Sequence, residues 1–321
     1  MAKMTLPQLK TFTATYVAAA KQAGTWSNST DNLIGLIDKI GKQITLDGTF
    51  NDTLPELNGD DLPYGKTIEE WFIDLTLPTT YTDPKASGFN AADTLKPYLP
   101  SVEDVAYNYT LGRSVISTTV PFDNFERAAL SADEAGNMAA KIMERLTNSY
   151  TLFTYAQKKQ LLGNLVTKAI TAKRYATVSV PANTETAEAF IKQVKGDVEA
   201  ASFASEGTSL GGALIGAAPE LILFVKKGVM PTVQVDAMAG AFHAEDLAIP
   251  AKIKVVDDFG SASENVFAIL ADPRGIKLHR GYHAVRENLN GQGDFINYFD
   301  HSENTGFISK NTFVQVYTTQ A

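Results

Sequence analysis

Cysteine is absent from this chain of 321 residues. That absence excludes disulfide bonds, a thiolate nucleophile and cysteine-ligated zinc. Stability must therefore come from packing and from association with other chains. Hydrophobic residues make up 44% of the sequence and charged residues 20%, which is an ordinary globular composition and argues against a disordered or collagen-like chain.

Long apolar runs are also missing. No segment approaches the ~20 consecutive apolar residues that a helix needs to cross a bilayer, and the start Met1–Met4 is not followed by the apolar core of a secretory signal. We therefore expect a soluble protein that has no membrane partner and is not secreted by that route.

Positive charge is in short supply, because the formal net charge is −8. This balance argues against a protein whose main task is to grip nucleic acid by neutralising phosphates. It leaves room for a surface that merely faces nucleic acid. An acidic lining would repel DNA and keep it from adhering, which suits a container better than a repressor.

Catalytic motifs are lacking as well. Gly207–Gly211 fits the spacing Gly-x-Ser-x-Gly, but it lies in a stretch rich in Gly, Ser and Ala that we expect to be a loop and not the strand-to-helix turn of a nucleophile elbow. The Gly-rich runs also lack the ending of a phosphate-binding loop. His279 and His283 are the only histidines close in sequence, but their strand-like context favours hydrogen-bonded or solvent-facing histidine over metal ligands. Asp257 and Asp258 stand at the end of a predicted strand, where a turn is commoner than a cation site. We expect no catalytic residue, no metal and no cofactor.

The most informative stretch runs from Pro63 to Leu75 and is followed by a turn-rich break, Leu77–Lys85. A return limb over about residues 102–120 then alternates apolar and polar side chains. Two extended limbs with a tip between them predict a β-arm that reaches out of its own subunit. Since a lone two-stranded ribbon is only marginally stable in water, such an arm needs a partner surface.

A helix is the competing interpretation of the outgoing limb. Thr67 and Glu70 form a capping-box pattern, and Ile68, Trp71, Phe72 and Leu75 have helical spacing. The returning limb favours the strand. In a strand the adjacent residues Glu69 and Glu70 point to opposite faces, so they cannot form a catalytic carboxylate pair.

The remainder of the chain predicts a mixture of helices and strands. A long helix is expected from about residue 131 to 173, where apolar residues repeat at steps of mainly three and four. A strand, a helix and two further strands are expected between residues 175 and 257, together with a short helix opened by Asp236. Four closing strands are expected at 266–270, 276–279, 296–299 and 312–317, separated by Pro-Arg-Gly, Asn-Gly-Gln-Gly and Glu-Asn-Thr-Gly turns.

Three strings resemble the major capsid proteins of small short-tailed, phi-29-like bacteriophages. They are Pro63-x-Gly65-x-Thr67-Ile68-Glu69-Glu70-x-x-x-Asp74; Val235–Phe242, followed by Asp257-x-Phe259-Gly260; and Arg274-Gly275 with the aromatic-rich strands after it. The first is the most specific, and the resemblance covers roughly residues 45–319.

The resemblance implies an α+β protein with the Hong-Kong-97-type phage capsid fold. The implied parts are an N-terminal arm at 1–56, an extended β-loop at 57–120, a peripheral domain with a long spine helix at 121–174, an axial domain at 175–262 and closing strands of the peripheral domain at 263–321. The extended loop would contact a neighbouring subunit through Lys66, Glu69, Glu70, Trp71, Ile73, Asp74 and Leu75.

The implied function is that of a major capsid protein that self-assembles as hexamers and pentamers into an icosahedral shell around double-stranded DNA. Such a protein would be part of the virion, would assemble in the host bacterial cytoplasm and would not be an enzyme. Its partners would be further copies of itself, a scaffolding protein, a portal protein and packaged DNA contacted non-specifically. No immunoglobulin-like module and no cleavable N-terminal segment are expected.

Three other functions fit parts of the sequence. An encapsulin-like compartment shell would have the same fold but a protein cargo. A phage accessory or tail protein would form a ring or tube. A hydrolase or metal enzyme would use His279, His283 or Asp257 and would act as a monomer.

Overall fold

The structure is a computed structural model of the chain. It describes residues 2–4, 15, 44–46, 52–62, 67–73, 83, 85, 102–107, 110–121, 132–203, 209–211, 218, 220–230, 249–260 and 264–320. These residues fall into two compact units. The first unit comprises Met1–Lys66, Thr110–Lys158 and Leu278–Gly306, and the second comprises Thr67–Tyr109, Lys159–Lys277 and Phe307–Ala321.

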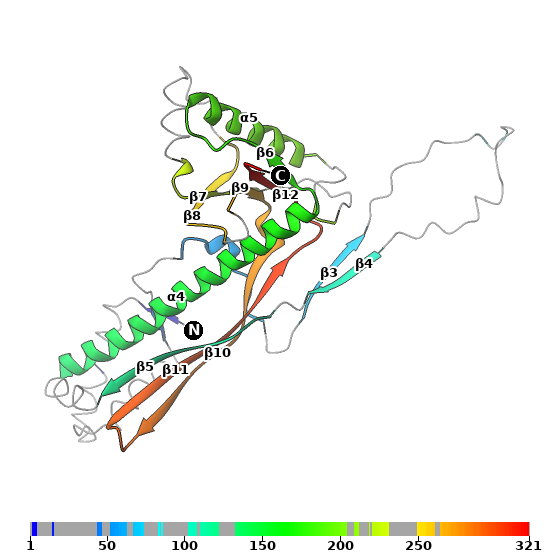
Figure 1. Cartoon of the computed structure of the whole chain (residues 1–321). Helices are drawn as coiled ribbons and strands as arrows, with labels where there is room; N and C mark the ends of the chain where they lie inside the picture. The colour runs from blue at the N-terminus through cyan, green and yellow to red at the C-terminus, as the bar shows by residue number, and fades with distance from the viewer. Residues whose placement is uncertain are drawn as a thin grey trace. The chain divides into compact units, whose positions relative to one another are not determined.

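The second unit is built on a five-stranded sheet in the order β6-β12-β9-β7-β8 (Figure 1). Its strands are β6 (Tyr175–Thr177), β7 (Ile222–Lys226), β8 (Lys252–Val256), β9 (Val266–Ala271) and β12 (Val314–Thr318). The central strands β12, β9 and β7 pair antiparallel, and the outer strands β6 and β8 pair parallel to their neighbours. All six residues of β9 are buried, as expected for a central strand covered on both faces.

Helix α5 (Thr184–Ala201) packs its apolar stripe on this sheet. Asn183 caps the helix, because its side chain accepts a hydrogen bond from the Thr186 amide in a reciprocal capping box. The buried side chain of Phe190 lies against Phe267 and Tyr317, with ring centroids 5.3 and 5.4 Å apart. Leu223, Val225 and other buried apolar residues complete a continuous apolar core.

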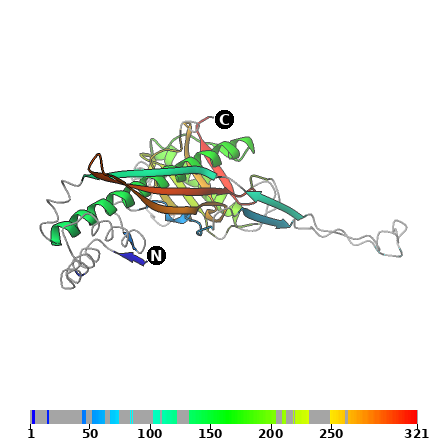
Figure 2. The same cartoon turned by 90° about the horizontal axis from the view of Figure 1, so that it is seen from below.

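The first unit contains a three-stranded sheet in the order β10-β11-β5, whose strands run side by side in Figure 2. The strands are β5 (Thr110–Pro121), β10 (Ile276–Asn290) and β11 (Phe295–Ile308). Strand β11 pairs antiparallel with β5 from Phe295↔Pro121 to Thr305↔Thr110. A short parallel pair, β1 (Ala2–Met4) with β2 (Ile44–Leu46), also belongs to this unit.

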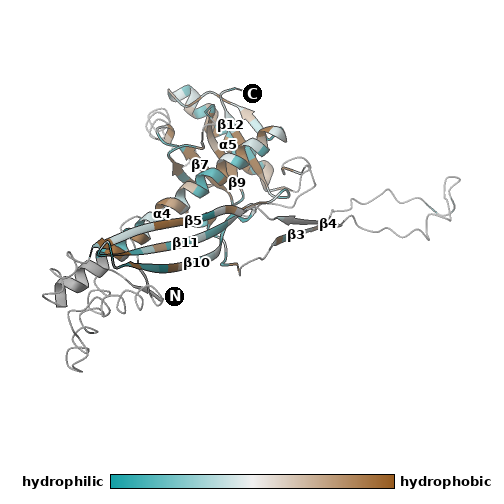
Figure 3. Cartoon of the chain, turned by 60° about the horizontal axis from the view of Figure 1, so that its bottom comes forward, coloured by the Kyte–Doolittle hydropathy of each residue, from teal (hydrophilic) through white to brown (hydrophobic). Residues whose placement is uncertain are grey.

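The buried face of the three-stranded sheet carries polar side chains among apolar ones, and Figure 3 colours long stretches of its strands as hydrophilic. Every second residue of β11 is buried, and those residues include Asp300, Ser302 and Asn304. Helix α4 (Ala132–Thr171) packs on this face: the Asn304 amide donates to Gln157 Oε1 at 2.6 Å, and the Tyr150 ring lies 5.4 Å from the His283 ring. We call this contact the polar seam.

Residues 52–62 also belong to the first unit and contact α4 and β10. The Lys158 ammonium of α4, fully buried, donates to Asp52 Oδ2 at 2.5 Å and to the Leu54 carbonyl at 2.9 Å. A one-turn 3-10 helix, Pro55–Leu57, buries Leu57, and the Gly59 amide donates to the Leu278 carbonyl. A buried lysine thus joins this segment to α4.

Most predicted elements are present where the described residues allow a test. The long helix expected at 131–173 is α4, and the helix capped by Asn183 is α5. Strands β10 and β11 are much longer than the predicted 276–279 and 296–299. The Glu-Asn-Thr-Gly turn prediction is wrong, because residues 303–306 continue β11 through a shift of register between Glu303 and Thr305. The predicted helix after Asp236 lies outside the described residues.

The return limb divides between two partners. Strand β4 (Val102–Tyr107) pairs with β3 (Ile68–Ile73), whereas β5, which begins at Thr110, pairs with β11. The return limb that the sequence predicts over about residues 102–120 is thus present as two strands with different partners. The pairing of β5 depends on residues that lie nearly two hundred positions later, so local alternation could not reveal it.

Candidate functional site

The two-stranded ribbon formed by β3 and β4 is the candidate site. The strands pair antiparallel in an unbroken register from Ile68↔Tyr107 to Ile73↔Val102. The strand prediction for residues 68–73 is therefore confirmed over the helix. Along β3, Ile68, Glu70 and Phe72 are half-buried, and Glu69 and Trp71 are exposed, which is the period-two alternation of a strand with one covered face.

The exposed face of the ribbon carries a large aromatic side chain. Trp71 is 67% exposed, an unusual state for so large an apolar surface. Phe72, on the opposite face, packs against the apolar core of the second unit. Of the other predicted contact residues, Lys66, Asp74 and Leu75 lie outside the described residues, and Ile73 is described only through its backbone pairing with Val102.

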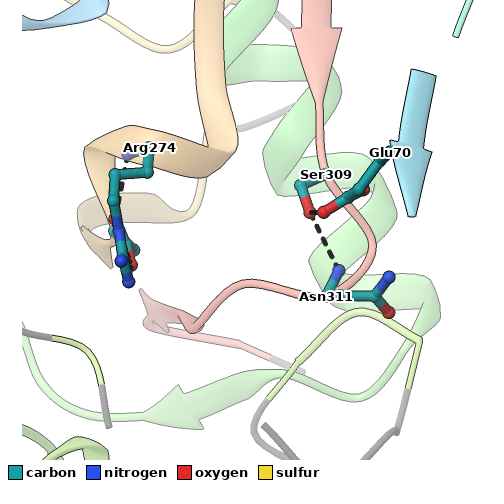
Figure 4. Close-up of polar contacts among 5 residues, drawn as sticks. Glu70, Arg274, Ser309 and Asn311 are labelled. Carbon is teal, nitrogen blue, oxygen red and sulfur yellow. Dashed lines mark hydrogen bonds and ion pairs between the residues drawn. The ribbon is translucent and has the colours of Figure 1, made fainter. Parts of the chain in front are cut away.

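Glu70 is turned toward its own chain (Figure 4). Its Oε2 accepts a hydrogen bond from the Tyr107 hydroxyl at 2.8 Å, and its Oε1 accepts one from the Ser309 hydroxyl at 2.5 Å. The sequence placed Glu70 among the inter-subunit contact residues. In the structure both of its carboxylate oxygens accept hydrogen bonds within the chain, and its contact with a neighbouring subunit stays a prediction.

The two histidines singled out in the sequence have separate environments. His279 Nδ1 lies 3.0 Å from the Asp60 carbonyl, and His283 Nε2 lies 2.9 Å from Asp300 Oδ1. The structure does not bring them together with a further carboxylate, and among the described residues no group of three or more His, Cys, Asp or Glu side chains could hold a metal ion.

Asp257 and Asp258 share a lysine. The Lys159 ammonium donates to Asp257 at 2.8 Å and to Asp258 at 2.9 Å. Burial opposes the charge of Lys159, but the two hydrogen-bonded carboxylates outweigh it and raise the pKa of that lysine. Asp258 also accepts a hydrogen bond from the Gly260 amide. Asp257 and Asp258 thus lie in a turn, and the Lys159 ammonium pairs with both carboxylates.

No helix within the described parts of the chain is long and apolar enough to cross a membrane.

Comparison with known proteins identifies the family. A sequence model of the Phi29-like phage major capsid proteins matches residues 9–317, nearly the whole chain. The chain belongs to this family. A family of major capsid proteins is a structural family and not an enzyme family, in agreement with the prediction from the sequence.

Two curated proteins similar to this chain are also major capsid proteins. The chain is 22% identical to the major capsid protein of Bacillus phage PZA over 287 residues, which cover 88% of this chain and 62% of the relative. It is 23% identical to the major capsid protein of Bacillus phage B103 over 274 residues, which cover 84% of this chain and 59% of the relative. The chain thus spans about three fifths of the length of these relatives.

Solved phage structures share the fold. A chain from the structure of the head fiber and inner core protein gp22 of native bacteriophage P68 matches with a TM-score of 0.65 at 12% identity, covering 85% of this chain and 86% of that one. A chain from the capsid structure of Staphylococcus phage Andhra matches with a TM-score of 0.60 at 12% identity, covering 86% of each. The mixed helices and sheets of this chain therefore have a phage capsid fold.

Sequence reasoning missed the partners of Glu70. Neither Tyr107 nor Ser309 is marked by a motif in the sequence. No local pattern in the sequence marks these partners, because they lie 37 and 239 residues from Glu70.

Proposed function

We propose that this chain is a major capsid protein that self-assembles as hexamers and pentamers into an icosahedral shell around double-stranded DNA, and that it is therefore part of the virion. The observation that carries the proposal is membership of the capsid protein family over residues 9–317. Family membership favours this function over an encapsulin-like compartment, a tail protein or an enzyme.

The parts of the chain are assigned accordingly. Residues 1–56 form an N-terminal arm, 57–120 the extended loop that contains the ribbon, 121–174 the peripheral domain with α4 as its spine helix, 175–262 the axial domain and 263–321 the closing strands. The continuity of α4 over Ala132–Thr171 supports the spine assignment. Strands β6, β7 and β8 and helix α5 come from the proposed axial segment, and the strands β9 and β12 of the same sheet come from the closing segment.

The ribbon would lie on a neighbouring subunit and bury Trp71 there. Covering such a side chain is worth roughly 1.5–3 kcal/mol, and the contact would recur at every subunit of a ring. Because a loop of one copy lies on a different surface of the next, the contact is heterologous, and a ring closes only when the rotation between subunits permits it. Glu69, Ile73 and the flanking residues Lys66, Asp74 and Leu75 would extend the same contact.

A scaffolding protein, a portal protein and packaged DNA are the further partners proposed for the shell. The net charge of −8 supports DNA contact that is loose and independent of sequence, because a predominantly acidic protein gains little from binding phosphates. Assembly would take place in the cytoplasm of a host bacterium.

Electron microscopy and light scattering of the purified protein, expressed with and without a scaffolding protein, test this function. We expect closed particles, and DNA in the particles isolated from infected cells. A protein cargo would support the compartment instead, open tubes or rings would support a tail protein, and a monomer under both conditions would contradict the proposal. A variant without residues 67–109 should stay folded by circular dichroism and should form no closed particles.

A further inference from the structure

We propose that Glu70 is a positioning residue that clamps the root of the ribbon to its own subunit, and thereby sets the direction in which the ribbon presents Trp71. The proposal deepens the capsid function and rests on it for its consequence in assembly. The clamp itself is argued from contacts within one chain.

Two hydroxyl groups connect Glu70 to residues 309–311. The Tyr107 hydroxyl donates to Glu70 Oε2 at 2.8 Å and accepts from the Lys310 amide at 3.1 Å. The Ser309 hydroxyl donates to Glu70 Oε1 at 2.5 Å and accepts from the Asn311 amide at 3.0 Å. Each carboxylate oxygen is thus linked through one hydroxyl to one backbone amide, which closes a network around the half-buried carboxylate. Figure 4 shows the arm through Ser309 and Asn311.

The segment on the other side of the network is itself held firmly. The Ser309 amide donates to the Gly275 carbonyl and the Gly211 amide donates to the Lys310 carbonyl, each at 2.8 Å. Gly275 packs so closely that an added Cβ would lie 1.9 Å from the Thr312 hydroxyl oxygen. The clamp therefore joins the ribbon to a part of the second unit with little freedom to move.

The turn Pro273–Gly275, which contacts residues 309–312, is held by an ion pair. Arg274 donates from Nη2 to the buried carboxylate of Asp272 at 2.5 Å and from Nε at 3.0 Å, and these hydrogen bonds raise the pKa of Arg274. A paired charge in this geometry keeps the Pro273–Gly275 turn in place beside residues 309–312.

The clamp also determines which face of the ribbon is free. Because successive side chains of a strand point to opposite faces, holding Glu70 inward directs Trp71 outward. The Tyr107 ring packs edge-on against Phe307 with centroids 4.9 Å apart, so the same root residue contributes an apolar contact. A ribbon released at this point could twist about its axis and present Trp71 in many directions.

The carboxylate is essential to this arrangement because each of its two oxygens accepts a hydrogen bond from a different hydroxyl group. In Glu70→Gln one of the two positions becomes an amide donor that faces a hydroxyl hydrogen. Tyr107→Phe removes one link while keeping the aromatic contact with Phe307. Glu69→Gln is the matched control, because it removes the same charge from the adjacent, exposed position of β3.

Hydrogen–deuterium exchange of the unassembled chain tests the clamp, and particle formation tests its consequence. We expect the amides of residues 68–73 and 102–107 to exchange about tenfold faster or more in Glu70→Gln and Tyr107→Phe, as for the loss of one charge-assisted hydrogen bond. Exchange in β7, β9 and β12 should be unchanged, and Glu69→Gln should resemble wild type throughout.

Equal ribbon exchange in Glu70→Gln, Glu69→Gln and wild type would overturn the clamp, whether or not the protein forms shells. Faster exchange together with fewer closed particles than wild type, in both Glu70→Gln and Tyr107→Phe, would support both the clamp and its role in assembly. Faster exchange in these two variants with wild-type particle yields would overturn the role in assembly. Absence of particles from wild type as well would count against the capsid function and leave the clamp established.

Discussion

Helix α4 contributes to two interiors of opposite character. In the first unit its buried residues include Leu146, Gln157 and Lys158. Gln157 accepts a hydrogen bond from Asn304 of β11, and Lys158 donates to Asp52 and the Leu54 carbonyl. In the second unit it buries Leu161, Leu162, Leu165, Val166 and Ala169, all fully. The change occurs between Lys158 and Lys159, two neighbouring residues whose ammonium groups bind different carboxylates.

The difference shows that one helix can be held by two kinds of interaction. Apolar burial contributes stability in proportion to area and tolerates small shifts. Hydrogen bonds and ion pairs are directional, add little net stability and cost much when one partner is removed. We infer that the second unit supplies most of the stability, whereas the polar seam fixes the register of α4 on β10 and β11.

The largest expected effect is in the apolar core. Phe190→Ala removes a fully buried ring from its contacts with Phe267 and Tyr317, and it should lower the free energy of unfolding by about 4 kcal/mol. Chemical denaturation of the unassembled protein measures this. Phe203→Ala, which removes an exposed ring just after the same helix, should change the value by less than about 0.5 kcal/mol. Similar losses in both variants would contradict the assigned core.

The second largest loss of stability is expected when the ion pair between Lys158 and Asp52 is broken. Asp52→Asn leaves the Lys158 ammonium buried without its carboxylate, which should cost roughly 3 kcal/mol at neutral pH. Asp60→Asn, an exposed change in the same segment, serves as the control and should be nearly silent.

The same pair gives a pH dependence with a defined sign. Burial opposes the charge of Asp52, but hydrogen bonds and the charge of Lys158 prevail and lower the pKa of this carboxyl in the folded state. A lowered folded-state pKa stabilises the fold above the unfolded-state pKa, and this contribution is lost as the pH falls through the folded-state pKa. The difference between wild type and Asp52→Asn should therefore shrink in acid; a constant difference down to the lowest pH would contradict the pairing.

The smallest expected effect lies in the polar seam. Asn304→Leu leaves the Gln157 carbonyl oxygen without its 2.6 Å hydrogen bond, which should cost about 2 kcal/mol. Adding Gln157→Leu replaces both partners by apolar groups and should recover most of that loss. A double-mutant cycle in denaturant measures the coupling. Additive losses would show that the two amides do not act as a pair.

The sequence predicted the apolar parts of the fold better than the polar parts. The helix expected at 131–173 is observed at Ala132–Thr171, and the predicted strand at 266–270 differs from β9 by one residue. Strands β10 and β11 were underestimated because residues such as Arg280, Asp300 and Asn304 interrupt the apolar alternation by which strands are recognised. Those residues form the buried side of the seam or border it, so polarity there did not indicate a loop.

The candidate site was predicted in outline. The strand of residues 68–73 and the opposite orientations of Glu69 and Glu70 follow from period-two spacing. The inward role of Glu70 could not be predicted, because its partners Tyr107 and Ser309 lie 37 and 239 residues away. Pairing at such separations is decided by the folded topology and leaves no local pattern.

The most direct test of the account is a cryo-electron-microscopy reconstruction of the assembled particles at a resolution that shows side chains. The account predicts closed shells in which the β3–β4 ribbon of each subunit lies on its neighbour, with Trp71 covered by that neighbour and Glu70 still bonded to Tyr107 and Ser309 of its own chain. Shells in which Trp71 faces solvent, or contacts only its own subunit, would contradict it.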